Sequence, residues 1–96
     1  MPDYIYLLHP FRHGLYDNPR PEEQAILAEQ ESHLKRAQEL GIVRLTGLCL
    51  DDTFAFVIFQ AEDEQAACEF MFHDPAVRAN LMAAELHPLQ LSPRII

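Results

Sequence analysis

The sequence predicts an α+β protein with a ferredoxin-like β-α-β-β-α-β order of elements, in a single domain over residues 1–96. Three observations predict this fold. Four segments are rich in aromatic and branched side chains, as strands are, and two amphipathic segments separate the first strand from the second and the third from the fourth. With this order of elements the strands form an antiparallel sheet that has both helices on one face.

The first strand is predicted over residues 4–11, where Tyr, Ile, Leu and Phe dominate. Residues 12–21 follow as a loop, because a glycine and two prolines interrupt the pattern. His9 and His13 are four residues apart, which would suit a metal site on a helix, but the proline between them argues against a helix. We therefore expect no metal at these histidines.

The first helix is predicted over residues 22–40. It begins after Pro21, has acidic side chains in its first turn, and ends before Gly41, a residue type that favours the position after a helix. One stripe of this helix, at spacings of seven, four and three, consists of Ile26, His33, Ala37 and Leu40. We expect this stripe to face the core.

Two further strands, residues 42–50 and 53–60, are joined by a turn at Asp51-Asp52. The second of them is the most apolar stretch of the chain, and its alternate side chains point to opposite faces. One face has Phe54, Phe56 and Ile58, and the other has Ala55, Val57 and Phe59. Both faces are apolar, whereas the helices of so short a chain can cover only one. We therefore expect a homodimer that forms through the sheet faces.

The second helix is predicted over residues 62–72. Asp74 followed by Pro75 is typical of a helix start, with the aspartate as the N-terminal cap and the proline at the first helical position. A short third helix is therefore expected over residues 76–84, and the last strand over residues 87–91.

The formal net charge of −8 argues against nucleic acid and anionic membranes as partners, because both require clustered Lys and Arg. No apolar run approaches the roughly 20 residues of a membrane span, and the N-terminus lacks the basic and apolar regions of a signal peptide. Cys49 and Cys68 lie in apolar segments without a C-x-x-C spacing, which predicts two buried free thiols and a cytoplasmic location. The glycines are isolated, so no phosphate-binding loop and no nucleotide cofactor are expected.

His33 and Asp74 are the candidate catalytic residues. Imidazole titrates near neutral pH, so a histidine at the edge of an apolar stripe can take or give a proton. The alternative is a histidine at the edge of the core that serves packing alone. For Asp74 the alternative is helix capping, which explains the Asp-Pro pair completely, although one carboxyl oxygen can cap while the other orients an imidazole. Arg12, after the first strand, is either an anion-binding residue or a solvated loop charge.

The chain resembles the YCII-related (YciI-like) family of small dimeric ferredoxin-like proteins. The resemblance covers most of the chain and rests on short motifs in a defined order, namely His33-Leu34, Gly41, Thr46-Gly47, the helix that contains Ala66, Asp74-Pro75 and Pro88. Three positions depart from the family pattern: Gln30 replaces an arginine, Ala76 an aromatic residue and Asn80 a glycine. The missing arginine and aromatic side chains alter charge and shape near the expected pocket.

The resemblance implies a homodimer whose two sheets pack face to face as a dimeric α+β barrel, with a pocket in each subunit. It also implies that His33 and Asp74 form a catalytic dyad. One branch of the family is associated with dehydrochlorinase activity on a chlorinated hydroquinone. The related barrel superfamily includes muconolactone isomerases and small monooxygenases.

The function that we expect is cofactor-free general acid–base chemistry on a small organic molecule, by elimination, isomerisation or hydrolysis. In this mechanism His33 moves the proton and Asp74 fixes its tautomer. The residues expected to contact the substrate are Arg12, Thr46, Gly47 and Pro75. Neither a metal nor a cofactor is expected. Two alternatives remain open, a non-catalytic ligand-binding or regulatory module and a purely structural interaction domain.

Overall fold

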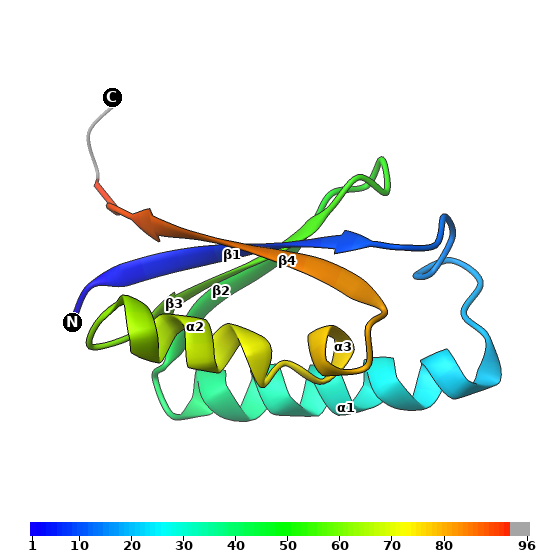
Figure 1. The fold of residues 1–96 in the computed structure, drawn as a ribbon, viewed down its shortest axis with the longest axis horizontal. Helices are drawn as coiled ribbons and strands as arrows, with labels where there is room; N and C mark the ends of the chain where they lie inside the picture. The colour runs from blue at the N-terminus through cyan, green and yellow to red at the C-terminus, as the bar shows by residue number, and fades with distance from the viewer. Residues whose placement is uncertain (93–96) are drawn as a thin grey trace.

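The computed structural model describes residues 1–92, which form a sheet covered on one face by helices. In chain order the elements are β1 (Asp3–Pro10), α1 (Pro21–Glu39), β2 (Val43–Leu48), β3 (Ala55–Gln60), α2 (Glu64–Phe72), α3 (Pro75–Arg78) and β4 (Met82–Leu89). The strands form one antiparallel sheet in the order β2-β3-β1-β4, and the helices lie together on one of its faces (Figure 1). The predicted α+β fold with a ferredoxin-like order of elements is confirmed.

β1 is a central strand of this sheet, and β2 and β4 are its edges. Tyr6 of β1 lies opposite Val57 of β3 on one side and Leu86 of β4 on the other. β2 pairs with β3, and the register shifts between Val43 and Leu45. The β2–β3 hairpin rises away from the layer of helices (Figure 1).

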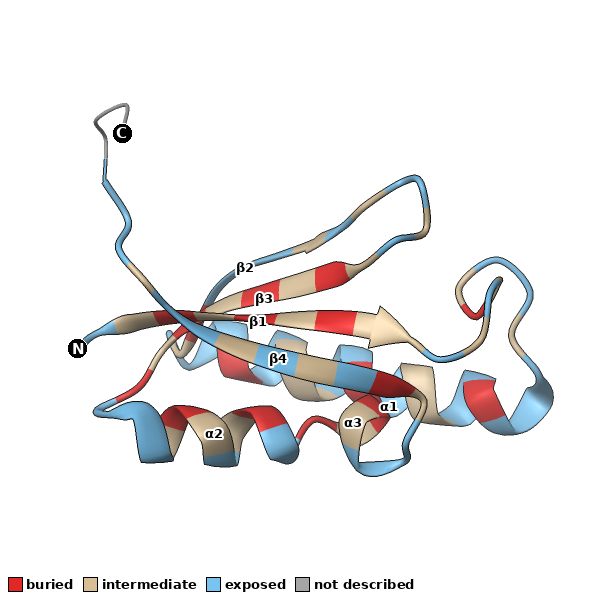
Figure 2. Ribbon diagram, turned by 45° about the horizontal axis from the view of Figure 1, so that its top comes forward, coloured by how far each residue is buried: buried red, intermediate tan, exposed pale blue. Residues whose placement is uncertain are grey.

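The core lies between the sheet and the helices. The alternate residues of β1 and β3 that face it are buried, namely Tyr4, Tyr6, Leu8, Ala55, Val57 and Phe59. Aromatic rings join the two layers, because the Phe59 ring centroid lies 4.8 Å from that of Phe70 on α2 and 5.6 Å from that of Tyr6. Figure 2 shows these buried positions alternating with less buried ones along both strands. The two-faced pattern predicted for β3 is present.

The opposite face of the sheet, which we name the open face, carries no helix from the described residues (Figure 1). Ile5 and Leu7 of β1 and Phe56 and Ile58 of β3 are half-buried there. Leu45 of β2 lies opposite Ile58 and is 54% exposed. The open face is therefore apolar at its centre and partly exposed to solvent in this single chain.

The segment after Asp74 differs from its prediction. α3 is one turn, Pro75–Arg78, rather than a helix that reaches residue 84, and β4 already begins at Met82. Asn80 has a φ of 63°, a left-handed backbone conformation that a helix does not continue through. The alanines after it pair with β1, so sheet pairing overrides their local preference for helix.

The other elements lie within two residues of their predicted ranges. Leu40, expected on the inner stripe of α1, is 66% exposed because it is the C-terminal cap residue rather than part of the packed helix. Cys49 and Cys68 are free thiols, as expected, but both are half-buried rather than buried. No helix within residues 1–92 has the length and apolar character that a membrane crossing requires.

Candidate functional site

The carboxylate of Asp74 is completely buried and is held by donors from separate parts of the fold. The hydroxyl of Tyr6, on β1, donates to Oδ2 at 2.7 Å. The side-chain amide of Gln30, on α1, donates to Oδ1 at 3.0 Å and to Oδ2 at 3.1 Å. The backbone N–H of Ala76, in α3, donates to Oδ1 at 2.9 Å. We name these four residues the Asp74 network. It contains no cation, so the hydrogen bonds from its neutral donors are what offset the desolvation of the carboxylate.

Burial and the nearby charge of Asp74 both raise the pKa of two phenols, Tyr6 and Tyr16. Burial raises the pKa of Tyr6, and the charge of Asp74 and its hydrogen bond to the Tyr6 hydroxyl raise it further. Burial also raises the pKa of Tyr16 to about 12, with smaller contributions from the charges of Asp74 and Asp52. Both hydroxyls therefore act as hydrogen-bond donors over the physiological pH range.

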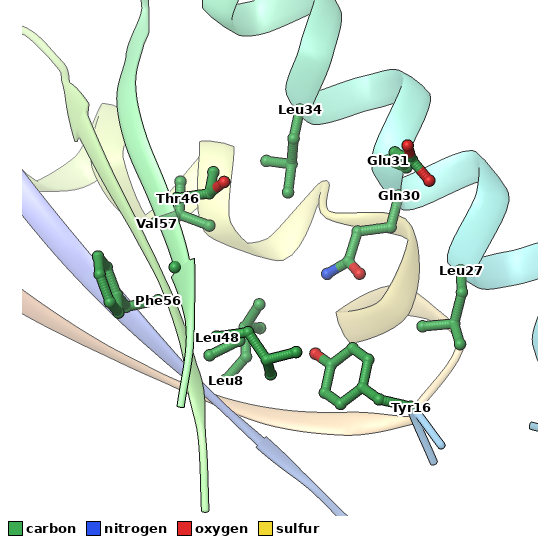
Figure 3. A pocket seen from close by; sticks show the side chains of 12 residues that line it. Leu8, Tyr16, Leu27, Gln30, Glu31, Leu34, Thr46, Leu48, Phe56 and Val57 are labelled. Atoms are coloured by element: carbon green, nitrogen blue, oxygen red, sulfur yellow. The ribbon is translucent and has the colours of Figure 1, made fainter. Parts of the chain in front are cut away.

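A pocket of about 410 Å³ lies between α1 and the β2–β3 hairpin. We name it the hairpin pocket. Most of its lining is apolar, from Leu8, Leu27, Leu34, Leu48, Ala55 and Val57. Its polar groups come from Tyr16, Gln30, Glu31 and Thr46 (Figure 3). An apolar hollow with a few polar groups is the usual form of a small-molecule site.

Gly47 and Phe56 are in close contact at the edge of the sheet, where the Phe56 ring lies on the open face and points away from Tyr16 and Gln30 (Figure 3). The two residues lie opposite each other on β2 and β3, and both line the pocket. A Cβ atom added at Gly47 would lie 2.3 Å from the Phe56 ring, closer than any side chain tolerates. Glycine at this position therefore allows the aromatic ring to lie directly over the edge strand.

The expected substrate contacts are not brought together. Thr46 and Gly47 line the hairpin pocket. Pro75 instead lines a separate hollow with residues that include Ile26 and Glu29. Arg12 belongs to neither lining. It lies in the loop that precedes α1, and its guanidinium is paired with a carboxylate in the first turn of that helix.

That carboxylate is Glu23, which joins the loop to the first turn of α1. Its two oxygens accept from the guanidinium of Arg12, with the Nε to Oε2 distance at 3.2 Å, and Oε1 also accepts from the backbone N–H of Arg20 at 2.8 Å. The hydrogen bond from Arg12 lowers the pKa of Glu23 to about 2, with help from the Arg20 backbone amide. Arg12 also donates to the carbonyl of Asn18 at 3.1 Å. Its charge therefore serves the loop structure.

His33 and Asp74 make no hydrogen bond to each other. The imidazole of His33 stacks on the ring of Phe70, with centroids 5.5 Å apart and planes 28° apart. Its Nε2 atom is buried and has no hydrogen-bond partner within residues 1–92. The side chain that reaches Asp74 from α1 is Gln30, almost one turn before His33. The predicted dyad thus lacks its direct contact in this conformation.

Sequence reasoning missed the roles of Gln30, Tyr6 and Tyr16. Gln30 carried a usable signal, because it lies four residues after Ile26 and three before His33, inside the apolar stripe of α1. A polar side chain on a buried stripe needs a polar partner. Tyr16 lies in a loop, where no periodic pattern indicates which way a side chain points.

Metal ligation has no support from the geometry of the described part of the chain. Within residues 1–92, no three His, Cys, Asp or Glu side chains are grouped so that they could hold a metal ion. The polar groups of the hairpin pocket are an amide, two hydroxyls and one carboxylate. Such groups can donate and accept hydrogen bonds and can exchange a proton.

No protein-family model and no curated protein matches the chain. Solved structures do match it in fold. One is the 5-chloro-2-hydroxyhydroquinone dehydrochlorinase from Burkholderia phenoliruptrix AC1100 in complex with 2,5-dihydroxybenzoquinone, with 18% sequence identity, a TM-score of 0.64, and coverage of 93% of this chain and 95% of that one. Another is muconolactone isomerase, with 16% identity, a TM-score of 0.72, and coverage of 100% of this chain and 95% of that one. The chain shares their fold. At these identities the likeness extends to the architecture and no further.

Proposed function

We propose that the protein is an enzyme that catalyses proton transfer on a small organic molecule bound in the hairpin pocket, without a cofactor. The observation that carries the proposal is the combination of an apolar pocket with a phenol, an amide and a carboxylate on its lining, backed by the Asp74 network. The reactions that suit such a site are elimination, isomerisation and hydrolysis. Two structures of the same fold bear the names of a dehydrochlorinase and an isomerase, which supports this class of chemistry.

Tyr16 is the proposed donor to the reacting oxygen of the substrate. Its hydroxyl is neutral at physiological pH, as that of an ordinary tyrosine is, and burial raises its pKa further, to about 12. In the free protein it donates to the thioether sulfur of Met82 at 3.4 Å. Sulfur is a weak acceptor, so a substrate oxygen can replace it at little cost and gain stabilisation of its developing negative charge.

Glu31 is the proposed proton acceptor on the pocket lining. Its carboxylate belongs to an exposed residue of α1, and it adjoins Leu34 and Thr46 in both the hairpin pocket and a neighbouring hollow. A carboxylate at the mouth of an apolar pocket can remove a proton from a bound molecule and exchange it with solvent.

The His33–Asp74 dyad stays a prediction alongside this arrangement. It requires the imidazole of His33 to leave Phe70 and to replace the Gln30 amide at Asp74. The unpartnered Nε2 atom of His33 favours such a change, because a buried nitrogen without a partner is unfavourable. His33→Ala abolishes turnover if the imidazole moves the proton and leaves it intact if Glu31 does.

The second candidate function is non-catalytic binding of a metabolite in the same pocket. The observation that favours it is that Asp74 is sealed from solvent with donors on both of its oxygens. A carboxylate in this state supports structure and does not itself touch a ligand. Binding that saturates while the ligand is recovered unaltered would identify this function.

A homodimer formed through the open face and a cytoplasmic location are part of the proposal. The apolar centre of the open face, with Ile5, Leu7, Phe56 and Ile58, is half-buried in the single chain. Packing against a second copy removes this area from water, which favours association.

The test is a screen of enolisable lactones and of chlorinated and hydroxylated aromatics, followed by mass spectrometry and by proton exchange in deuterated water. We expect conversion or exchange of at least one compound. Glu31→Gln and Tyr16→Phe should each reduce its rate by about 100-fold to 10,000-fold. Glu29→Gln is the matched control, because Glu29 lies on the same helix but lines a different hollow. Equal rates for Glu31→Gln and Glu29→Gln would remove Glu31 from the mechanism.

A further inference from the structure

The Asp74 carboxylate determines which end of the Gln30 side-chain amide faces it. A carboxylate only accepts hydrogen bonds, so the NH₂ group of Gln30 must face it, and the distances from Nε2 to the two oxygens are 3.0 and 3.1 Å. The Tyr6 hydroxyl and the Ala76 N–H already occupy the other directions around Asp74. The carbonyl oxygen of Gln30 is therefore held away from Asp74.

This oxygen lacks a partner. Gln30 is 7% exposed, and among residues 1–92 no donor makes a hydrogen bond to its Oε1 atom. The side chain nevertheless lines the hairpin pocket, and Figure 3 shows its amide extending from α1 toward the sheet, on the side where Tyr16 and Leu8 lie. The pocket therefore presents to whatever enters it an acceptor on a side chain that Asp74 holds in place.

The hairpin pocket also lacks a positive charge. Among the described residues that line it, Glu31 is the charged one. Arg12 is held by Glu23 outside the lining, and Lys35 lines the adjoining hollow instead. The Asp74 carboxylate lies directly behind Gln30. An anionic ligand would lie near the carboxylates of Glu31 and Asp74, and no cation on the lining would offset the repulsion, which is unfavourable in an apolar site.

We propose that the hairpin pocket selects an uncharged molecule with an apolar body and a hydroxyl or N–H group that donates to Oε1 of Gln30, and that it rejects carboxylates. Asp74 is the positioning residue that fixes the polarity of this contact. The inference rests on the proposed function, because it takes the hairpin pocket as the binding site, and it adds the chemical class of the ligand.

Three fluorescent probes of similar shape test the preference, namely 2-naphthol, 2-methoxynaphthalene and 2-naphthoate, titrated into the full chain at pH 7. We expect 2-naphthol to bind at least about fivefold more tightly than its methyl ether, because the ether leaves the Gln30 oxygen without a donor. We expect 2-naphthoate to bind more weakly than either. Equal affinities for the naphthol and the ether, or tightest binding of the naphthoate, would overturn the inference while leaving the pocket in place.

Two variants separate the role of Gln30 from a general preference for hydroxyls. Asp74→Asn gives Gln30 a partner that both donates and accepts, so the amide can turn over, and the preference for naphthol over ether should fall to within about twofold. Gln30→Arg places a cation beside the pocket and keeps donors toward Asp74, so the affinity for 2-naphthoate should rise by about tenfold or more. Gln65→Met, at an exposed position on α2, should change none of the three affinities.

The location of the probes is tested by Thr46→Trp, which places a large side chain in the hairpin pocket from an exposed position of β2. Loss of all binding in this variant supports the pocket as the site. Unchanged binding, or a wild-type chain that binds none of the three compounds, would overturn the pocket and with it both the inference and the proposed function.

Discussion

The hydroxyl of Tyr6 provides a direct test of the Asp74 network. Tyr6→Phe removes the donor that lies 2.7 Å from Oδ2 of Asp74 and retains the ring. The ring keeps its edge-on contacts with Phe59 and Phe70, whose centroids are 5.6 and 6.3 Å away. The substitution therefore removes one hydrogen bond to a buried carboxylate and creates no cavity larger than a hydroxyl group.

A hydrogen bond to a charged group contributes roughly 1.5 to 3 kcal/mol to stability. Asp74 keeps its donors from Gln30 and Ala76 in the variant, so the middle of this range applies, and we expect the free energy of unfolding to fall by about 2 kcal/mol. For a domain of this size such a loss lowers the melting temperature by roughly 8 to 16 °C.

The measurement is urea unfolding followed by circular dichroism, with Tyr4→Phe as the matched control. Tyr4 lies on the same face of β1, is 7% exposed and contacts the same Phe59 ring, but its hydroxyl makes no hydrogen bond to a residue in 1–92. We expect this control to change stability by less than about 0.5 kcal/mol. Equal losses for the two variants would show that the Tyr6–Asp74 hydrogen bond does not stabilise the fold.

The same variant has a characteristic pH dependence. The raised pKa of Tyr6 means that the folded chain holds this proton more tightly than the unfolded chain, in which tyrosine titrates near 10. The stability that the protonated phenol provides is complete below about pH 10 and is lost as the pH rises above it. The difference in stability between wild type and Tyr6→Phe should therefore narrow between pH 9 and pH 11, and a constant difference would contradict the assigned shift.

Three further substitutions test other features. Gly47→Ala should destabilise the chain by about 1 to 3 kcal/mol in thermal unfolding, because the new Cβ meets the Phe56 ring at 2.3 Å; an unaffected melting temperature would show that the ring moves freely. Glu23→Gln removes a carboxylate whose pKa Arg12 lowers to about 2. In the wild type this carboxylate stabilises the fold above about pH 4.3, and its contribution is lost as the pH falls toward 2. The variant lacks this contribution at every pH. Urea midpoints at pH 7 and pH 3 should then differ less in this variant than in wild type. Ile58→Asp, on the open face, should halve the mass measured by light scattering if the proposed homodimer forms there, and an unchanged dimer mass would place the interface elsewhere.

Most of the fold follows from periodicity in the sequence. The alternation in β3 and the boundary signals at Pro21 and Gly41 placed these elements within two residues of their observed limits. The region after Asp74 did not follow, because its alanines favour a helix locally, whereas their actual conformation depends on pairing with β1. Pairing between strands so far apart in sequence leaves no local signal.

The site was harder to predict for the same reason. Asp74 was identified as a helix cap, and its carboxylate does accept the N–H of Ala76. Its other partners, Tyr6 and Gln30, lie 68 and 44 residues away in the sequence. The choice between Gln30 and His33 as the α1 residue that reaches Asp74 depends on the rotation of the helix about its axis. That rotation is set by packing of the whole stripe rather than by any single residue type.

The connection of Asp74 to distant strands and helices has a consequence for hydrogen exchange. α3 has four residues, too few for a helix that is stable alone. The amide proton of Ala76, however, is bonded to a carboxylate that Tyr6 ties to β1 and Gln30 ties to α1. It can reach deuterated solvent only when those elements separate, so the smallest helix of the protein should include one of its slowest-exchanging amides.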